Sequence, residues 1–371
     1  MNPPSPAIVA QNAVRSLPRW IMLLLCATYI FAGFVGREPW RDVDITAFGW
    51  MQAMAHGDSP WLQPVLDGVT PHNPGLLQYW LGAWALQSLP AGMPADLVVR
   101  LPFMALLGLA LWCTWGAVFS LARTPGAQPV AFAFGGEASP NDYARAMADG
   151  GLLAILACLG LAQFSHETSH TLVQLAAVCA MFFAAASMWW YPKLAALAAF
   201  LGALGLALAG APALAVLLGL GGMATALWVQ APKLRQRYSW AAWWVVSIAV
   251  AAAAAWMLDQ WEYRLINPWV QGKDWQSSTR LLMWFSWPAW PLALWALWRW
   301  RGQLQAASRN PHLLLPLWLW VLAVVSTIFT FDNDRALILA LPGIAALAAF
   351  ALPTLKRSLG ALIDWLTLFF F

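Results

Sequence analysis

Charged residues are scarce in this sequence: only 10% of its 371 residues are Asp, Glu, Lys or Arg, whereas 61% are apolar. A soluble domain carries about 25% charged residues. So few charges cannot form the polar surface that a chain of this length needs in water, which excludes an ordinary soluble protein and a disordered linker alike. The net charge of +4 is too small and too dispersed for a nucleic-acid-binding patch, so we expect no nucleic-acid partner. An integral membrane protein remains.

Cysteine is rare too, and its four copies stand far apart. Cys26, Cys113, Cys158 and Cys179 each lie in an apolar run without a CxxC pair, which is typical of small buried side chains rather than of disulfides or metal ligands. The sequence also lacks the P-loop, GxGxxG, GxSxG and HExxH motifs and any zinc-ligand spacing. Ionisable residues are nearly absent from the apolar runs, which disfavours an ion-coupled transporter or a proton pump.

Long apolar runs are what the sequence has in abundance, and about twenty apolar residues span a bilayer as a helix. Candidate spans cover 19–36, 75–90, 98–121, 149–164, 172–190, 194–210, 212–230, 240–258, 281–298, 312–331 and 336–353. A twelfth run begins at 359 and stops in mid-run at residue 371, from which we expect a truncated form of a longer protein. We therefore predict a single all-α, polytopic membrane domain over 1–371 with about 11–12 transmembrane helices.

Basic residues predict the orientation of the spans. Arg15 and Arg19 precede the first span, and further Lys and Arg residues cluster at 233–237, 299–309 and 356–357. These segments are expected to face the cytoplasm, which leaves the loops 165–171, 259–280 and 332–335 on the outer side. Counting from the two ends of the chain gives answers that differ by one crossing. The difference disappears if the short run 75–90 is partly a juxtamembrane helix.

Two stretches outside the spans are long. Residues 37–74 form the first outer loop, in which 45–54 places Phe48, Met51 and Ala55 on one helical face, so we expect an amphipathic helix lying on the membrane. Residues 122–148 are rich in Pro and Gly, which predicts a mostly irregular loop. Tryptophan is densest at 284–300, a pattern typical of an interfacial belt or of an aromatic wall beside a lipid or sugar.

The few polar residues collect at the mouths of the outer loops. In the densest group, Asp42 and Asp44 are flanked by Arg37 and Arg41, and a second polar cluster covers 163–170. A carboxylate kept ionised beside arginine can take a proton from a hydroxyl nucleophile, and arginine can hold a phosphate. The alternative is a solvated, helix-capping acidic turn. These positions place any chemistry at the outer membrane surface.

At these positions the chain resembles the bacterial GT-C glycosyltransferases, the aminoarabinose-transferase and protein-mannosyltransferase-like enzymes that use polyprenyl-phosphate sugars. The run Arg-Glu-Pro-Trp-Arg-Asp-Val-Asp at 37–44 is similar to their first periplasmic loop. Pro-His-Asn-Pro-Gly at 71–75 with Tyr-Trp at 79–80 is similar to their Lys-Pro-Pro-Leu and Tyr-Trp. The Arg-Leu-Pro at 100–102, the His-Glu at 166–167, and Arg335 with the Leu-Pro at 341–342 resemble later motifs in the same order.

The chain also departs from the family pattern. Val43 stands where the family has its catalytic Asp, and Asp44 stands at the Glu that follows. Asn73 replaces the lysine of the Lys-Pro-Pro motif, and Gly75 replaces its second proline. The family continues with more helices and commonly with a C-terminal periplasmic domain, which this sequence lacks.

The resemblance implies an inverting transfer from a polyprenyl-phosphate sugar at the periplasmic face of a bacterial inner membrane. Asp44 or Asp42 would take a proton from the acceptor, which is a lipid, a glycan or a protein. Positive charge from Arg37, Arg41, Arg335 or a divalent metal would stabilise the departing lipid phosphate. The residues expected to position donor or acceptor are His72, Tyr79, His166, Glu167 and His170, and the candidate metal ligands are Asp44, His72 and Glu167.

Two rival interpretations stay open. The substitution at Val43 and the early end of the chain favour a non-catalytic homologue that binds polyprenyl lipid or a partner protein. A transporter or flippase for a lipid-linked sugar would share the apolar helices, but it needs a polar path across the membrane, and few polar residues lie inside the spans. We therefore rank the transporter third.

Overall fold

The computed structural model describes the chain over 5–14, 18–36, 38–39, 42–71, 75–88, 92–228, 234–261, 275–305, 310–329 and 334–355. These residues are helical apart from their connecting loops, and their β structure is limited to two isolated bridges. The prediction of an all-α protein is therefore confirmed. The four cysteines are free, and Cys113, Cys158 and Cys179 are buried, as the sequence predicts.

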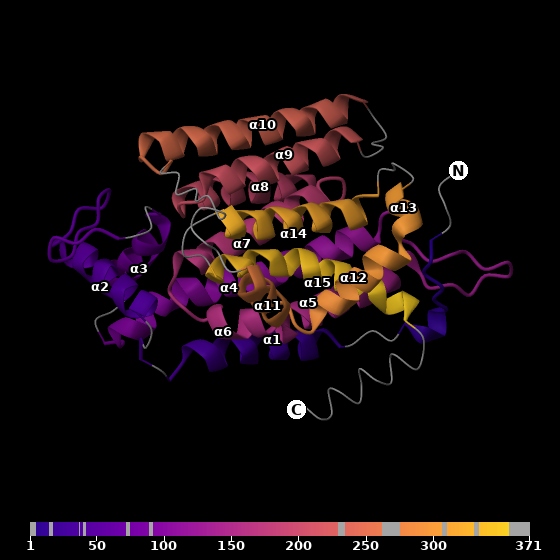
Figure 1. Ribbon diagram of the computed structural model, residues 1–371, viewed down its shortest axis with the longest axis horizontal. Coiled ribbons are helices and arrows are strands. Elements are labelled where there is room, and N and C mark those ends of the chain that lie inside the picture. Colours follow the sequence, from indigo (N-terminus) through magenta and orange to yellow (C-terminus); the bar gives the residue numbers. More distant parts are fainter. Residues whose placement is uncertain are drawn as a thin grey trace.

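The helices follow one another along the chain, with long connections at 57–76 and 123–139 (Figure 1). Their bounds are η1 (Gln11–Ala13), α1 (Arg19–Phe34), α2 (Asp42–His56), α3 (Leu77–Ser88), α4 (Ala95–Ala122), α5 (Pro140–Ala157), α6 (Leu159–Phe164), α7 (His170–Ser187), α8 (Pro192–Leu208), α9 (Pro212–Trp228), α10 (Leu234–Met257), α11 (Trp275–Phe285), α12 (Ala289–Arg299), α13 (Arg301–Gln305), α14 (Pro311–Phe329), η2 (Asp334–Ala340), α15 (Leu341–Ala351) and η3 (Leu352–Thr354).

Five helical segments in the described residues are long and apolar enough to cross a membrane: Ala95–Ala122, His170–Ser187, Arg235–Met257, Pro311–Ile328 and Arg335–Thr354. Three shorter apolar helices, α1, α8 and α9, run beside them. The segments His170–Ser187 and Arg335–Thr354 are the most buried of the five, so they form the centre of the bundle. The expected twelfth span, from 359, lies outside the described residues.

Two of the expected spans are each divided into two helices. The run 149–164 breaks at Cys158, whose backbone is extended, and 281–298 breaks between α11 and α12, where Pro288 has no N–H to donate. The two breaks meet, because the N–H of Leu159 donates to the carbonyl of Trp287 at 3.1 Å. Gly160 leaves space there for the ring of Phe285. The second break thus supplies a hydrogen-bond acceptor to the first, and the first supplies space for a side chain of the second.

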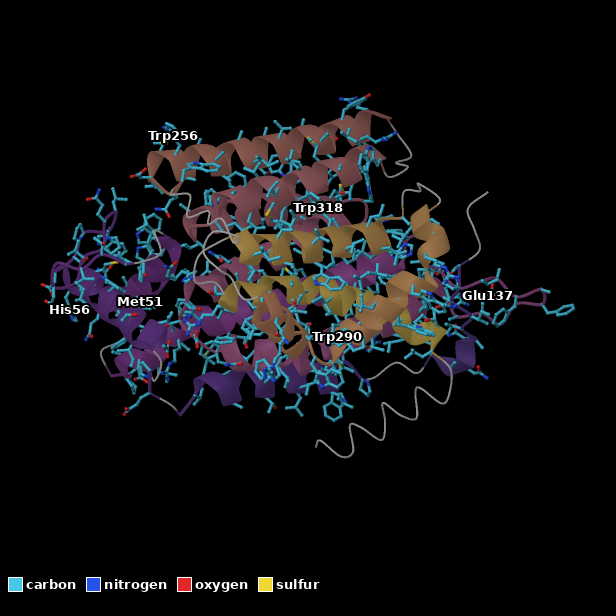
Figure 2. All side chains as sticks on the ribbon, in the orientation of Figure 1. Met51, His56, Glu137, Trp256, Trp290 and Trp318 are labelled. Atoms are coloured by element: carbon cyan, nitrogen blue, oxygen red, sulfur yellow. The ribbon has the colours of Figure 1, made fainter. Side chains whose placement is uncertain are left out.

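Different helices and loops lie at the two ends of the molecule (Figure 1). We call them the α2 end, where α2 and α3 lie, and the α13 end. Figure 2 places Met51 and His56 at the α2 end and Glu137 at the opposite one. The basic residues of α13 and of the start of α10 lie at the α13 end together with the start of α1. This separation agrees with the charge pattern of the loops.

The run 75–90 forms α3, which stays at the α2 end instead of crossing the bundle (Figure 1). It has 12 residues, about 18 Å of helix, whereas the bilayer core is about 30 Å thick. The N–H of Leu76 donates to the carbonyl of Leu208 at 2.8 Å, which fixes the start of α3 at the end of α8. With α3 as a non-crossing helix, both counts of the loop orientation agree.

The apolar face of α2 packs on α3, and the expectation that this helix lies on the membrane stays a prediction. Met51 is fully buried and fits against Gly82 of α3, where a larger residue would collide with it. The rings of Trp50 and Tyr79 meet edge to face with centroids 5.8 Å apart. Sequence periodicity reveals an apolar face but not its partner, and here the partner is the neighbouring helix.

The loop expected over 122–148 is irregular only to Ser139, because α5 begins at Pro140. Ser139 caps this helix by accepting from the N–H of Asp142, and proline suits the first helical turn. The Gln11 amide donates to Asp142 at 2.9 Å, and this bond and the one from Ser139 lower the pKa of that carboxyl. Residues 5–14 therefore tie down the loop before α5.

The Trp-rich segment 284–300 is part exposed and part core. Trp284, Trp287 and Trp298 are exposed, whereas Trp300 is buried and donates to the carbonyl of Phe350 at 3.0 Å. Trp295 donates to the Thr354 hydroxyl at 3.0 Å. The belt and the aromatic wall both stay predictions, and both can draw only on the exposed tryptophans of this segment.

The non-crossing α3 predicts that residues on both sides of it share one side of the membrane. Asp58 precedes α3 and Met93 follows it, and both are exposed. In intact membrane vesicles, Asp58→Cys and Met93→Cys should react from the same side with a membrane-impermeant maleimide. Phe134→Cys, which is exposed at the α13 end, should react only from the opposite side. Labelling of Asp58→Cys and Met93→Cys from opposite sides would contradict this topology.

Candidate active site

The loop between α6 and α7 is polar and yet buried. Its residues Ser165, His166, Glu167, Thr168 and Ser169 all have low solvent exposure. Buried polar groups are usually hydrogen-bonded, so each of these side chains either has a hydrogen-bond partner in the protein or can bind a ligand. The loop lies at the α2 end, where α1, α2, α7 and η2 meet.

Asp44 joins α2 to this loop. Its carboxylate is 1% exposed, and Oδ1 accepts two hydrogen bonds from Thr168, one from the backbone N–H at 2.9 Å and one from the hydroxyl at 2.6 Å. The second oxygen, Oδ2, is buried without a hydrogen-bond partner. One oxygen of Asp44 is therefore fixed in place and the other is available to take a proton or to accept from a ligand.

Glu167 forms an ion pair with Arg335 of η2, with 3.7 Å between Arg335 Nε and Glu167 Oε2. The guanidinium of Arg335 also lies over the ring of Phe164, 5.4 Å from its centroid. The side chain of Arg335 is 24% exposed, while that of Glu167 is 2% exposed. The positive charge of the pair is therefore nearer the surface than the negative charge. Two of the predicted site residues, 168 positions apart in the chain, thus meet here.

His166 connects the same loop to α1. Its Nε2 lies 3.0 Å from the carbonyl of Tyr29 and its Nδ1 lies 3.3 Å from the hydroxyl of Ser165. A carbonyl only accepts, so Nε2 carries the proton and donates. The ring packs between those of Tyr29 and Phe34 and fills the space that Gly33 leaves. With both nitrogens engaged, His166 holds the loop in place.

Arg100 is a buried residue of this region that the site prediction left out. It is 2% exposed and donates to the carbonyl of Phe34, the last residue of α1, at 3.2 Å, and it pairs with Asp96 at 3.4 Å. The carbonyls at a helix C-terminus lack partners within the helix, and arginine supplies one. An arginine in an otherwise apolar run was the signal that could have identified it.

The other predicted residues take different places. Tyr79 is buried against Trp50, six residues beyond Asp44 in α2, and burial raises the pKa of its phenol, which stays neutral. His170 is the first residue of α7 and is partly exposed. Asp42 begins α2, while Arg37, Arg41 and His72 lie outside the described residues.

A metal site does not emerge from the described residues. No group of three His, Cys, Asp or Glu side chains among them is arranged to hold an ion. Of the candidate ligands, Asp44 is bound by Thr168 and Glu167 by Arg335, and His72 lies outside the described part of the chain. Because Arg335 already supplies positive charge beside Glu167, we derive no chemical step through a metal.

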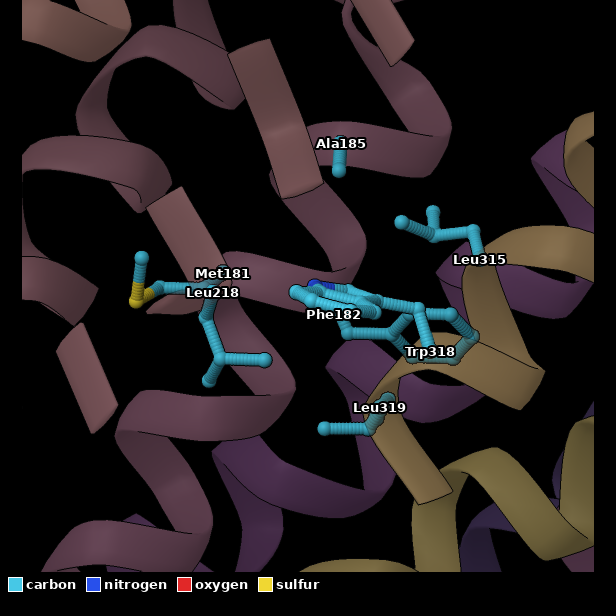
Figure 3. A pocket seen from close by; sticks show the side chains of 7 residues that line it. All are labelled: Met181, Phe182, Ala185, Leu218, Leu315, Trp318 and Leu319. Carbon is cyan, nitrogen blue, oxygen red and sulfur yellow. The ribbon is translucent and has the colours of Figure 1, made fainter. Parts of the chain in front are cut away.

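An apolar cavity of about 10 Å³ lies between α7, α9 and α14, away from these residues (Figure 3). Met181, Phe182, Leu218 and Trp318 are among the side chains around it. This volume is about that of one water molecule, and the apolar lining offers a water few partners. The cavity is a packing defect between helices and no substrate site.

The fit of His166 against Gly33 predicts a stability effect in Gly33→Ala. A Cβ there would collide with the imidazole ring, so we expect destabilisation by about 1–3 kcal/mol and a lower melting temperature in detergent. Gly108→Ala is the matched control, because its Cβ would meet Ile30 at an ordinary 3.6 Å. That variant should be neutral or slightly stabilised. Equal melting temperatures for the two variants would contradict the close fit.

No protein-family model matches the sequence, and no curated protein matches it. Two solved structures are similar in fold, both of ArnT from Cupriavidus metallidurans. With the structure bound to undecaprenyl phosphate, the TM-score is 0.62 at 14% identity over 94% of this chain and 63% of that chain. With the apo structure the TM-score is 0.57 at 15% identity over 92% and 61%.

The chain thus spans less than two thirds of the length of ArnT, a GT-C aminoarabinose transferase. At this level of identity the likeness is one of fold. It confirms the expectation that the sequence motifs raised: the protein has a GT-C-like fold.

Proposed function

We propose that the protein is a glycosyltransferase that moves a sugar from a polyprenyl-phosphate donor to a hydroxyl-bearing acceptor. The observation that carries the proposal is Asp44, a buried carboxylate with one oxygen fixed by Thr168 and the other without a partner. It lies at the same end of the bundle as the Glu167–Arg335 pair. The GT-C-like fold supports the reaction class.

In the proposed reaction, the free oxygen of Asp44 accepts the proton of the acceptor hydroxyl. The acceptor oxygen then forms a bond to the anomeric carbon from the side opposite the lipid phosphate, and the bond from that carbon to the phosphate oxygen breaks with inversion. A positioned base of this kind accelerates such a step by roughly 10²–10⁴. Asp42, at the start of α2, is the second candidate for the base.

The departing lipid phosphate carries negative charge, and Arg335 is the described cation best placed to stabilise it. Glu167 orients the guanidinium, and the partial exposure of Arg335 lets it reach an anion at the membrane surface. Arg37 and Arg41 are proposed to add charge from the first loop. His72, Tyr79 and His170 are proposed to position donor or acceptor, while His166 acts by holding the loop.

The site is proposed to face the periplasm of a bacterial inner membrane. The α13 end has the basic residues Arg299 and Arg301, which favour the cytoplasm. Asp44, Glu167 and Arg335 gather at the other end. A polyprenyl-phosphate donor reaches such a site along the bilayer, with its tail beside the helices. The ArnT structure with undecaprenyl phosphate supports a lipid of this class.

A non-catalytic lipid-binding homologue is the second candidate function. It is favoured by Val43 at the family Asp position and by the two bonds that Thr168 makes to Asp44. Both candidates bind polyprenyl phosphate, and they differ only in turnover. A lipid-linked sugar transporter ranks third, because buried hydroxyls such as Thr114 and Ser120 in α4 bond to carbonyls of their own helix.

The role of Asp44 predicts that Asp44→Asn lowers transfer at least about 100-fold, because the amide cannot accept the proton. Transfer would be measured with purified protein and radiolabelled polyprenyl-phosphate sugars, with Asp42→Asn in parallel. Asp58→Asn removes an exposed carboxylate at the same end and should leave turnover unchanged. Undiminished turnover in both Asp44→Asn and Asp42→Asn would exclude these bases. Absence of transfer by the wild type from every donor would favour the non-catalytic candidate.

The proposed phosphate contact predicts that Arg335→Gln lowers kcat at least about tenfold, since one stabilising charge is lost as the lipid phosphate departs. Arg335→Lys keeps the charge but loses the planar fork, and it should recover part of the rate. Arg301→Gln, at the α13 end, serves as the control. An equal loss in Arg335→Gln and Arg335→Lys, with lowered melting temperatures, would point to a structural role instead.

A further inference from the structure

The helices α2 and α3 run side by side in the same direction, which sets the level of every residue between them. Near their ends, the Gln87 amide donates to the carbonyl of Ala55 at 3.1 Å. Before that, Met51 fits against Gly82 and Trp50 contacts Tyr79. Continued toward both N-termini, this register sets residue 78 level with about residues 47–49 of α2, one turn beyond Asp44.

The faces of the two helices agree with this placement. Asp44 and Met51 are seven residues apart, so they share one face of α2, and Gln78 and Gly82 are four apart, so they share one face of α3. Met51 and Gly82 contact each other, which turns both faces toward one another. Gln78 therefore points toward the side of α2 on which Asp44 lies.

The start of α7 closes this junction from a third side. Thr168 binds Asp44, Ser169 precedes α7 and Thr171 lies in its first turn. The helices α3 and α7 are in contact. Thr171 thus lies about one helical turn beyond Thr168, and the level of Gln78 lies about one turn of α2 beyond Asp44.

The polar groups at this junction are buried and unpaired. Both amide atoms of Gln78, the hydroxyls of Ser169 and Thr171, the indole nitrogen of Trp50 and Oδ2 of Asp44 have no hydrogen-bond partner. The Tyr79 hydroxyl lies near the Gln78 amide but without the distance and angle of a hydrogen bond. Folded proteins pair nearly all such groups, and several unpaired ones on three neighbouring segments that include the Asp44 carboxylate indicate a place for a polar ligand.

The donors and acceptors among the unpaired atoms indicate which class of ligand can bind them. An amide offers donors and an acceptor, a hydroxyl does both, and an indole donates. A phosphate at neutral pH mainly accepts and an ammonium only donates, whereas each hydroxyl of a sugar ring donates and accepts. We propose that Gln78, Thr171 and Trp50 form a subsite that binds the ring hydroxyls of the donor sugar next to Asp44. This inference rests on the proposed function and adds its sugar-recognition residues.

The test compares two probes, undecaprenyl phosphate carrying glucose or mannose and undecaprenyl phosphate without a sugar, in equilibrium binding to the purified full chain. In Gln78→Leu and Thr171→Val, the sugar-bearing probe should bind about tenfold more weakly, because its hydroxyls lose partners. Binding of the bare lipid phosphate should not change. The melting temperature without ligand should stay the same or rise, since each substitution removes unpaired buried atoms at similar volume.

Gln174→Leu is the matched control, because Gln174 is also buried but donates to the carbonyl of Ala209 at 2.8 Å. It should lower the melting temperature and leave the ratio of the two affinities unchanged. This opposite pair of effects separates a ligand-binding glutamine from a structural one.

Three results would overturn the subsite. Unchanged affinities for both probes in Gln78→Leu and Thr171→Val, in a wild type that prefers the sugar-bearing probe, overturn it and leave the proposed function standing. So does equal weakening of both probes, which would assign these residues to the lipid site. A wild type that binds neither probe overturns the subsite and the proposed function together.

Discussion

The contact between Asp44 and Thr168 is the interaction on which the arrangement of the α2 end depends. It joins two segments separated by 124 positions along the chain, and it does so where little water reaches. In such surroundings a carboxylate needs strong donors, and Thr168 supplies both its N–H and its hydroxyl to one oxygen. The contact thereby orients α2 and leaves the second oxygen buried without a hydrogen-bond partner.

The C-terminal turns of α1 form the base under this contact. The carbonyls of Tyr29 and Phe34 accept from His166 and Arg100, which belong to two other segments of the chain. The carbonyl of Phe34 would otherwise lack a partner, because a helix cannot satisfy the carbonyls of its own last turn. These bonds therefore stabilise the C-terminus of α1 and also fix the position of the loop that holds Thr168.

Hydropathy predicted most of the helical segments, because a bilayer requires long apolar runs whatever their tertiary contacts are. It could not predict the break at Cys158, since the partner of that break is the carbonyl of Trp287, more than a hundred residues away. The polar motifs located Asp44, Glu167 and Arg335. Thr168 and Arg100 lie in stretches that the sequence singles out, but their partners, Asp44 and the carbonyl of Phe34, are set by tertiary packing. Gln78 has no spacing pattern at all, and only its burial reveals it.

The fit of His166 against Gly33 also bears on how the protein is made. The chain is synthesised from its N-terminus, so α1 is in place long before the loop that must dock on it. Asp44 of α2 can bind Thr168 only after α3, α4, α5 and α6 have been synthesised. The α2 end is consequently completed late in synthesis, and η2, which brings Arg335, completes it last of all.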